Sequence, residues 1–261
     1  MKFMTNAQDY GIIEVKSDFP VRRLLRVPHR ETPLIAGFPA FGPGYFSSNA
    51  AEMKKNYSHP VTGERISFRE PTTSESISLA AYKFSEMAKS DIFDPRWLQI
   101  GRIVRTSEGV YTNPSKEALN CSEVDEGKLK KLIERAKKIK VGKGHVYLGD
   151  NDFGFADYDS FTTGVQDADI FTNGGLAFIL EHARDPKNLR IIASPKNYPR
   201  GVNVWSFDKV DSPILKVAGL DSDRDSDGGR LGVFGGSWVG SGSGYAFGVL
   251  DAGEASTAQK I

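Results

Sequence analysis

Four aspartates alternate with other residues between Asp221 and Asp227, directly before Gly228. Carboxylate oxygens are the ligands that Ca²⁺ prefers, and the stretch that begins at Asp223 matches the D-x-D-x-D-G opening of a calcium loop. That loop needs a bidentate Glu at its twelfth position, which is Phe234 here. We therefore expect no metal and no cofactor, and keep a calcium-stabilised structural domain as an alternative.

Glycine and serine alternate from Gly240 to Gly244, as they do in phosphate-binding loops and nucleophile elbows. A phosphate-binding loop needs Lys and then Ser or Thr after its last glycine, to reach the phosphates and the metal, and neither follows here. A nucleophile elbow needs glycine two positions to either side of its serine. No serine in this segment meets that condition, so neither chemistry is indicated.

Paired carboxylates are the remaining candidates for catalysis. Asp150, Asp152, Asp157 and Asp159 lie in the sequence GDNDFGFADYD and could act as acid and base in a cleft. Turns need the same residue types for backbone reasons, and we favour that explanation. The four histidines are far apart and are expected to be structural, and a single cysteine, Cys121, excludes an internal disulfide or a multi-cysteine metal site. We expect no enzymatic activity.

The composition of the segment from Asp221 to Tyr245 is unusual, because it contains no Lys, Glu, Gln or Met. Lys and Glu make up about half of an ordinary charged fraction of ~25%, so about three are expected in such a window. If the positions began as AAC codons and only adenines were replaced, every product keeps a third-base C. Such codons give Ser, Asp, Gly, Val, Phe, Tyr and Arg but never the missing residues. A glycine-rich loop of biased composition is the alternative.

These candidate residues must be positioned by the elements around them. The first seventy residues suggest short strands at Ile12–Val15, Val21–Val27 and Ile66–Arg69, and no helix. Thr72 and Glu75 form a capping box that predicts an amphipathic helix over Thr73–Lys89.

Further elements follow from spacing. A hairpin is expected from Leu98–Thr106 and Gly109–Thr112. A second helix is expected to begin near Ser122, with an apolar face of Leu129, Leu132, Ile133, Ala136 and Ile139.

Short strands dominate the rest of the chain. The sequence predicts strands at Val202–Phe207, Ile214–Ala218, Arg230–Phe234 and Tyr245–Leu250, with a brief helical piece around Leu176–His182. The fold class is α+β, with two main helices and several short antiparallel strands. We expect a strand-rich extension over residues 1–70 packed on a main domain over 71–250, and a flexible tail over 251–261.

Charge and hydropathy exclude several classes of function. The formal net charge is +1, which gives no electrostatic case for nucleic-acid binding. No run approaches the length needed to span a membrane, and residues 1–16 show no classical export signal. Membrane insertion is therefore not expected, and the location stays open between the cytoplasm and display by another route.

The closing segment resembles a known family. Gly235-Gly236-Ser237-Trp238, followed by GYAFGV from Gly244, is similar to the end of the C-type lectin fold in variable proteins of diversity-generating retroelements. In that family, adenine-specific errors rewrite codons near the C-terminus of a ligand-binding protein. This chain departs from the family in having Gly-Tyr-Ala-Phe where Gly-Phe-Arg is common. Formylglycine-generating enzymes share the fold, but resemblance to them implies two catalytic cysteines.

The resemblance implies a diversified surface over residues 221–245 that recognises a protein or glycan ligand without catalysis. Scaffold residues would be Leu231, Val233, Trp238, Tyr245, Phe247 and Val249, and the alternating residues of the strand would point to solvent. Arg224, Phe234 and Tyr245 would be the main anchors. The candidate variable or ligand-binding residues are Ser222, Asp223, Arg224, Asp225, Ser226, Asp227, Gly232, Phe234, Ser237, Val239, Gly240, Ser241, Gly242, Ser243 and Tyr245.

Overall fold

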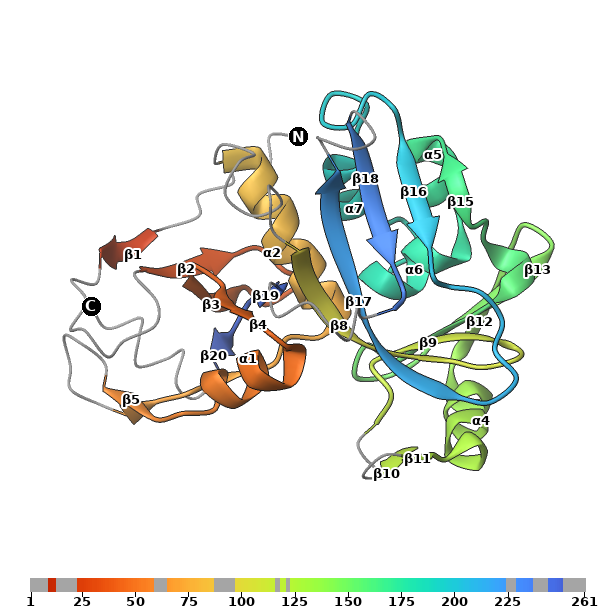
Figure 1. Ribbon diagram of the computed structural model, residues 1–261, viewed down its shortest axis with the longest axis horizontal. Helices are drawn as coiled ribbons and strands as arrows, with labels where there is room; N and C mark the ends of the chain where they lie inside the picture. Colours follow the sequence, from red (N-terminus) through yellow and green to blue (C-terminus); the bar gives the residue numbers. More distant parts are fainter. Residues whose placement is uncertain are drawn as a thin grey trace. The chain divides into compact units, whose positions relative to one another are not determined.

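A computed structural model gives the fold of the chain and consists of two compact units (Figure 1). The larger unit is Thr72–Trp238, and the smaller one joins Met1–Pro71 to Val239–Ile261. The residues that the structure describes are 9–12, 23–58, 65–86, 97–115, 118–120, 123–223, 229–236 and 244–250. Most strands of each unit belong to one sheet.

The sheet of the larger unit has strands in the hydrogen-bonded order β12-β13-β14-β9-β8-β17-β18-β16-β15. Their bounds are β8 Trp97–Arg105, β9 Gly109–Thr112, β12 Lys137–Val141, β13 Gly144–Leu148, β14 Gly154–Asp157, β15 Gly164–Gln166, β16 Val202–Trp205, β17 Ile214–Asp223 and β18 Arg230–Phe234. Neighbours along this path are antiparallel except β16 and β18, which are parallel. The chain thus mixes helices with mostly antiparallel strands.

Helices α6 and α7 lie behind β16 and β18 in Figure 1, and α6 packs on Gly154 and Thr112. Helix α4 packs on Tyr111 and Phe155, which alternation places on the opposite face of the sheet. The helices are α2 Thr73–Glu86, α4 Glu126–Arg135, α5 Ala168–Thr172, α6 Gly175–Glu181 and α7 Lys187–Ile192, with a short 3₁₀ turn at Tyr158–Ser160 and a small ladder of β10 Leu119–Asn120 with β11 Glu123–Val124. The expected helical piece at Leu176–His182 is confirmed as α6, whereas α5 and α7 were not expected. No helix in the described ranges is long and apolar enough to cross a membrane.

The start of α2 confirms the capping box. The backbone N–H of Thr72 donates to Glu75 Oε2 at 2.8 Å, and the backbone N–H of Glu75 donates to Thr72 Oγ1 at 3.2 Å. Two donors that a helix terminus leaves without an intrahelical acceptor are thereby satisfied. The expected helix is confirmed from Thr73 to Glu86, beyond which residues 87–96 lie outside the described ones.

The end of α4 differs from expectation. The predicted helix extended to Ile139, but α4 ends at Arg135 and Ala136 is extended, with ψ 154°. The residues Lys137–Val141 pair instead with β13 across a five-residue ladder. Gly142, with φ +58°, makes the tight turn between these strands, a conformation that suits glycine. Sheet pairing outweighs helical propensity here, so the assignment of Ile139 to the helical face was wrong.

Two strand predictions are confirmed closely. The hairpin of β8 and β9 pairs Arg105 with Val110 and Ile103 with Thr112. β18 spans Arg230–Phe234 as expected, although its two neighbours, β17 and β16, could not be known from spacing alone.

The sheet of the smaller unit has the strand order β1-β2-β3-β20-β7. The strands of this unit are β1 Asp9–Ile12, β2 Arg23–Val27, β3 Leu34–Phe38, β4 Phe41–Gly44, β5 Tyr57–Ser58, β6 Arg65–Ile66, β7 Phe68–Arg69, β19 Gly244–Ala246 and β20 Val249–Leu250. β20 pairs with both β3 and β7, and β19 pairs with β4. β20 therefore completes a sheet formed by strands of the first seventy residues, whereas β19 and β4 pair with each other outside that five-stranded sheet. The division expected at residues 70 and 250 stays a prediction about domains.

A helix in the smaller unit corrects the expectation that none would occur there. α1 spans Phe46–Met53 and buries Phe46, Asn49, Ala50 and Met53. These positions recur at intervals of three and four, the helical spacing of one buried face. Asn49 fixes the helix further by donating through Nδ2 to the carbonyls of Gly44 at 3.3 Å and Gly244 at 2.9 Å.

Candidate functional site

The predicted variable positions that the structure describes fall mainly on β17 and β18. Leu231 and Val233 are fully buried and face the helices, and alternation places Gly232 and Phe234 on the opposite face of the sheet, called the outer face below. Register extends this face to β17, because Asp221 pairs with Gly232. Side-chain direction alternates along β18 as expected, but Leu231, Gly232, Val233 and Phe234 are all buried, so the expectation that Gly232 and Phe234 point to solvent was wrong.

Phe234 corrects one expectation. Although its side chain is on the outer face, it does not point into solvent and is only 4% exposed. Its ring lies 4.7 Å from that of Trp97 and 5.4 Å from that of Trp205, centroid to centroid. It also covers Gly219, where an added Cβ would be 2.1 Å from the ring. The missing side chain at Gly219 makes the room that this aromatic cluster occupies.

The cluster unites four strands and was not expected from the sequence. Trp97 begins β8, Trp205 ends β16, and Phe234 pairs with Gly219 of β17 and with Trp205. Both tryptophans are partly exposed. For Trp205 the sequence signal was the alternation of VNVW, in which Val202 and Val204 are buried and Trp205 takes the other face.

Ser222 corrects a second expectation. It pairs with Leu231 and therefore shares the helix-covered face, where it is 7% exposed. A side chain in that position cannot vary freely without disturbing the core. Asp223 pairs with Arg230 at the end of β17.

Tyr245 lies in the smaller unit and is partly buried. A Cβ added at Gly42, on the neighbouring strand β4, would be 2.9 Å from its ring. The other predicted positions lie outside the described residues: Arg224, Asp225, Ser226, Asp227, Ser237, Val239, Gly240, Ser241, Gly242 and Ser243.

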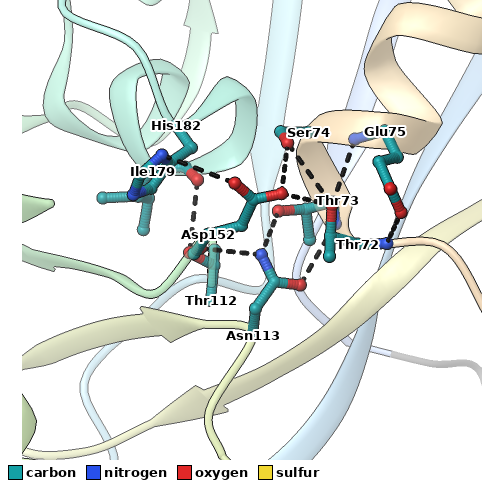
Figure 2. A network of polar contacts seen from close by, with 9 residues as sticks. All are labelled: Thr72, Thr73, Ser74, Glu75, Thr112, Asn113, Asp152, Ile179 and His182. Carbon is teal, nitrogen blue, oxygen red and sulfur yellow. Dashed lines mark hydrogen bonds and ion pairs between the residues drawn. The ribbon is translucent and has the colours of Figure 1, made fainter. Parts of the chain in front are cut away.

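Asp152 organises the densest polar network of the described residues shown in Figure 2. Its carboxylate Oδ2 accepts from Thr72 Oγ1 at 2.6 Å and from Ser74 Oγ at 2.7 Å. Its Oδ1 lies 3.6 Å from His182 Nδ1. The carboxylate also lies beside the N-terminus of α2, where the helix dipole favours negative charge.

Asn113 extends this network to the backbone. Its Nδ2 donates to the Asp152 carbonyl and to Thr73 Oγ1, both at 2.9 Å, and its Oδ1 accepts from the Thr73 N–H at 3.1 Å. Nearby, Thr112 Oγ1 donates to the carbonyl of Ile179 at 3.2 Å. β9, the turn before β14 and two helices are joined at this point.

The geometry of the network is that of a structural cluster. In a Ser-His-Asp triad the imidazole stands between the hydroxyl and the carboxylate, whereas here Ser74 donates directly to Asp152. Asp152 and Ser74 are both buried, so a substrate could not approach them without opening the fold. The second carboxylate considered for acid–base work, Asp157, accepts from the His145 N–H at 2.7 Å.

Glu181 is the buried acid with a raised pKa. Burial raises the pKa of its carboxyl, and the backbone N–H groups of Asn188 and Leu189, both at 2.9 Å, oppose this rise by donating to it. Both donors belong to α7, so Glu181 links the end of α6 to the next helix. Among the described residues, no three His, Cys, Asp or Glu gather as a metal site would require.

Comparison with known proteins gives one structural likeness to report. No protein-family model matches the sequence, and no curated protein matches it. The fold is similar to a solved structure described as "Accommodation of massive sequence variation in Nanoarchaeota by the C-type lectin fold". The identity is 13% and the TM-score 0.41, over 81% of this chain and 91% of that chain. Likeness at this level does not place the chain in a family.

Proposed function

We propose that the protein is a binding module on a C-type lectin-like scaffold, whose C-terminal surface is diversified by adenine-specific retroelement mutagenesis. It recognises a protein or glycan ligand and does no chemistry. The observation that carries the proposal is the strand β18, whose two faces differ in what they tolerate. The side chains of Leu231 and Val233 are fully buried in the core. A Cβ added at Gly232 would contact only Asp221, whose Cβ would be 3.4 Å away, an ordinary contact distance.

In the sequence, β18 separates the two segments that contain most of the predicted variable residues. The Asp-rich segment 224–228 precedes this strand and the Gly/Ser segment 237–243 follows it, so the two segments leave from opposite ends. Five residues of strand span about 13 Å. This length is shorter than the width of a specific interface, which covers roughly 800 Å² per partner.

The aromatic cluster changes which residues are assigned to the ligand. Phe234 and Ser222 belong to the frame, because both are buried within the larger unit. Recognition then depends on residues in the two flanking segments and on Gly232. This variant presents few large anchors there, so we expect weak affinity for an arbitrary target.

The absence of catalysis is part of the proposal. The carboxylate nearest to hydroxyl and imidazole groups, Asp152, is buried and holds the start of α2. A formylglycine-generating activity would need two cysteines, and the chain has only Cys121.

The test is sequencing of the DNA around the gene. We expect a near-copy of the segment that encodes residues 221–245, differing from it at adenines and lying beside a reverse transcriptase gene. Across a population, the codons of Gly232 and of residues 239–243 should vary, whereas those of Leu231 and Val233 should not. Uniform variation over both faces of β18, or no template copy, would overturn the proposal.

A further inference from the structure

Positive charge is concentrated in one part of an otherwise balanced chain. Residues 126–143 contain eight basic side chains and two acidic ones, a formal net charge of +6. The rest of the chain carries −5, since the whole carries +1. All of this segment is described and belongs to α4, β12 and the turn before β13.

Helical spacing gathers part of this charge on one side of α4. Lys128, Lys131 and Arg135 recur at intervals of three and four and are exposed, while Leu129 is fully buried against the aromatic residues of β9 and β14. Lys128 is 3.5 Å from Asp125, but this ion pair is exposed and leaves the local excess of positive charge in place.

The strand that follows adds to the same side. The ammonium of Lys138 lies 5.7 Å from the centre of the Tyr147 ring, and Tyr147 packs on the cluster that α4 covers. Lys138 therefore lies on the α4 side of the hairpin, and alternation places Lys140 there too. We call Lys128, Lys131, Arg135, Lys138 and Lys140 the basic surface.

Edge protection explains only part of this surface. β12 is the last strand on its side of the sheet, and lysines on an edge strand discourage pairing with another chain. The three α4 residues of the basic surface, Lys128, Lys131 and Arg135, are not on a sheet edge. Like charges held this close repel one another, and a multivalent anion relieves that repulsion.

We propose that the basic surface adsorbs the protein to an anionic lipid bilayer, independently of the ligand recognised through β18. Lysine suits this partner, because attraction to a diffuse negative surface needs point charges and does not need the planar, bidentate guanidinium of arginine. The segment has one arginine and no Asn or Gln to read base edges, which disfavours nucleic acid. The apolar residues of α4 face the core, so the protein would lie on the headgroups without inserting.

Vesicle co-sedimentation of the full chain tests the proposal. The probes are vesicles of phosphatidylcholine alone and vesicles with about a third phosphatidylserine. We expect binding only to the anionic vesicles, with most of it lost between about 0.15 M and about 0.5 M salt. Equal binding to both vesicles, or to neither, would overturn the proposal.

A triple variant locates the binding surface. Lys128→Gln, Lys131→Gln and Arg135→Gln together should weaken partitioning by about a hundredfold, since each basic residue near the surface contributes roughly fivefold. Gln keeps helical propensity, so the far-ultraviolet circular dichroism should not change.

A matched control removes the same charge elsewhere in the larger unit. Lys187→Gln, Lys196→Gln and Lys209→Gln replace three exposed lysines outside the basic surface and should leave partitioning within about twofold. Equal losses in the two triple variants would show a net-charge effect and contradict the assignment. Tighter binding to duplex DNA than to anionic vesicles at the same salt would identify nucleic acid as the partner and also contradict it.

Discussion

Replacing Phe234 by Ala distinguishes a frame residue from a variable one. The ring is 4% exposed and packs on Trp97, Trp205 and Gly219, so truncation removes nearly all of a buried aromatic side chain. Substitutions of this kind cost about 3–5 kcal/mol. We expect about 3 kcal/mol, the lower end, because the two tryptophans are partly exposed and can close over the space.

The matched control is Gly232→Ala, two residues earlier on the same face. Its Cβ meets Asp221 at 3.4 Å, and the backbone of Gly232 does not require glycine. We expect a change within about 0.5 kcal/mol, or a small gain from reduced freedom of the unfolded chain. The two variants, both in β18, should therefore differ clearly in their loss of free energy of unfolding, which is large for Phe234→Ala and small for Gly232→Ala.

Urea unfolding followed by tryptophan fluorescence measures both variants. All three tryptophans, Trp97, Trp205 and Trp238, belong to the larger unit, so the signal reports on that unit. With a slope of about 2–3 kcal/mol per molar urea, a loss of 3 kcal/mol lowers the midpoint by about 1 M or more. Equal midpoints for the Ala variants at positions 232 and 234 would refute the assignment of Phe234 to the frame.

Three further substitutions test particular contacts. Gly219→Ala should destabilise by about 1–3 kcal/mol because its Cβ would be 2.1 Å from the Phe234 ring. In a double-mutant cycle with Phe234→Ala the two losses should be less than additive, and strict additivity would contradict the clash. Asp152→Asn removes the negative charge of a buried carboxylate that accepts from the hydroxyls of Thr72 and Ser74, and it should lower the free energy of unfolding by about 1–3 kcal/mol. The exposed Asp150→Asn should change little in the same urea titration. For Glu181, whose pKa burial raises above 4.5, the unfolded chain loses its proton first as pH rises. Stability should therefore be highest below pH 4.5 with respect to this group and fall through the raised pKa, and Glu181→Gln should remove that part of the pH dependence in unfolding titrations.

Local patterns were predictable where neighbouring residues supply the interaction. The side chains of Thr72 and Glu75 each accept a hydrogen bond from the other residue's backbone N–H, within one helical turn. The start of α2 could therefore be predicted from the four residues 72–75. The same holds for the alternation along β18, in which Leu231 and Val233 take one face. Neither prediction needed knowledge of what packs nearby.

Predictions failed where a distant partner decided the outcome. Lys137–Val141 has helical composition at its start, yet five ladder pairs with β13 hold it as a strand. α1 was missed although its apolar residues recur at helical spacing, because the glycines and prolines before it suggested continued turns. The candidate site shows the same division, since the buried positions of Phe234 and Ser222 follow from strand pairing.

The sequence by itself determined the alternation of side-chain direction along β18, the capped start of α2 and the unusual composition of residues 221–245, because each is a property of adjacent residues. Only the tertiary structure decided that the side chain of Phe234 is enclosed, although it faces away from Leu231 and Val233. Gly232 and Phe234 lie on the same face of β18. Trp97, Trp205 and Gly219, which belong to other strands, enclose the ring of Phe234. The burial of a side chain depends on all the residues that pack around it in the fold, and the sequence of one strand does not show which residues these are.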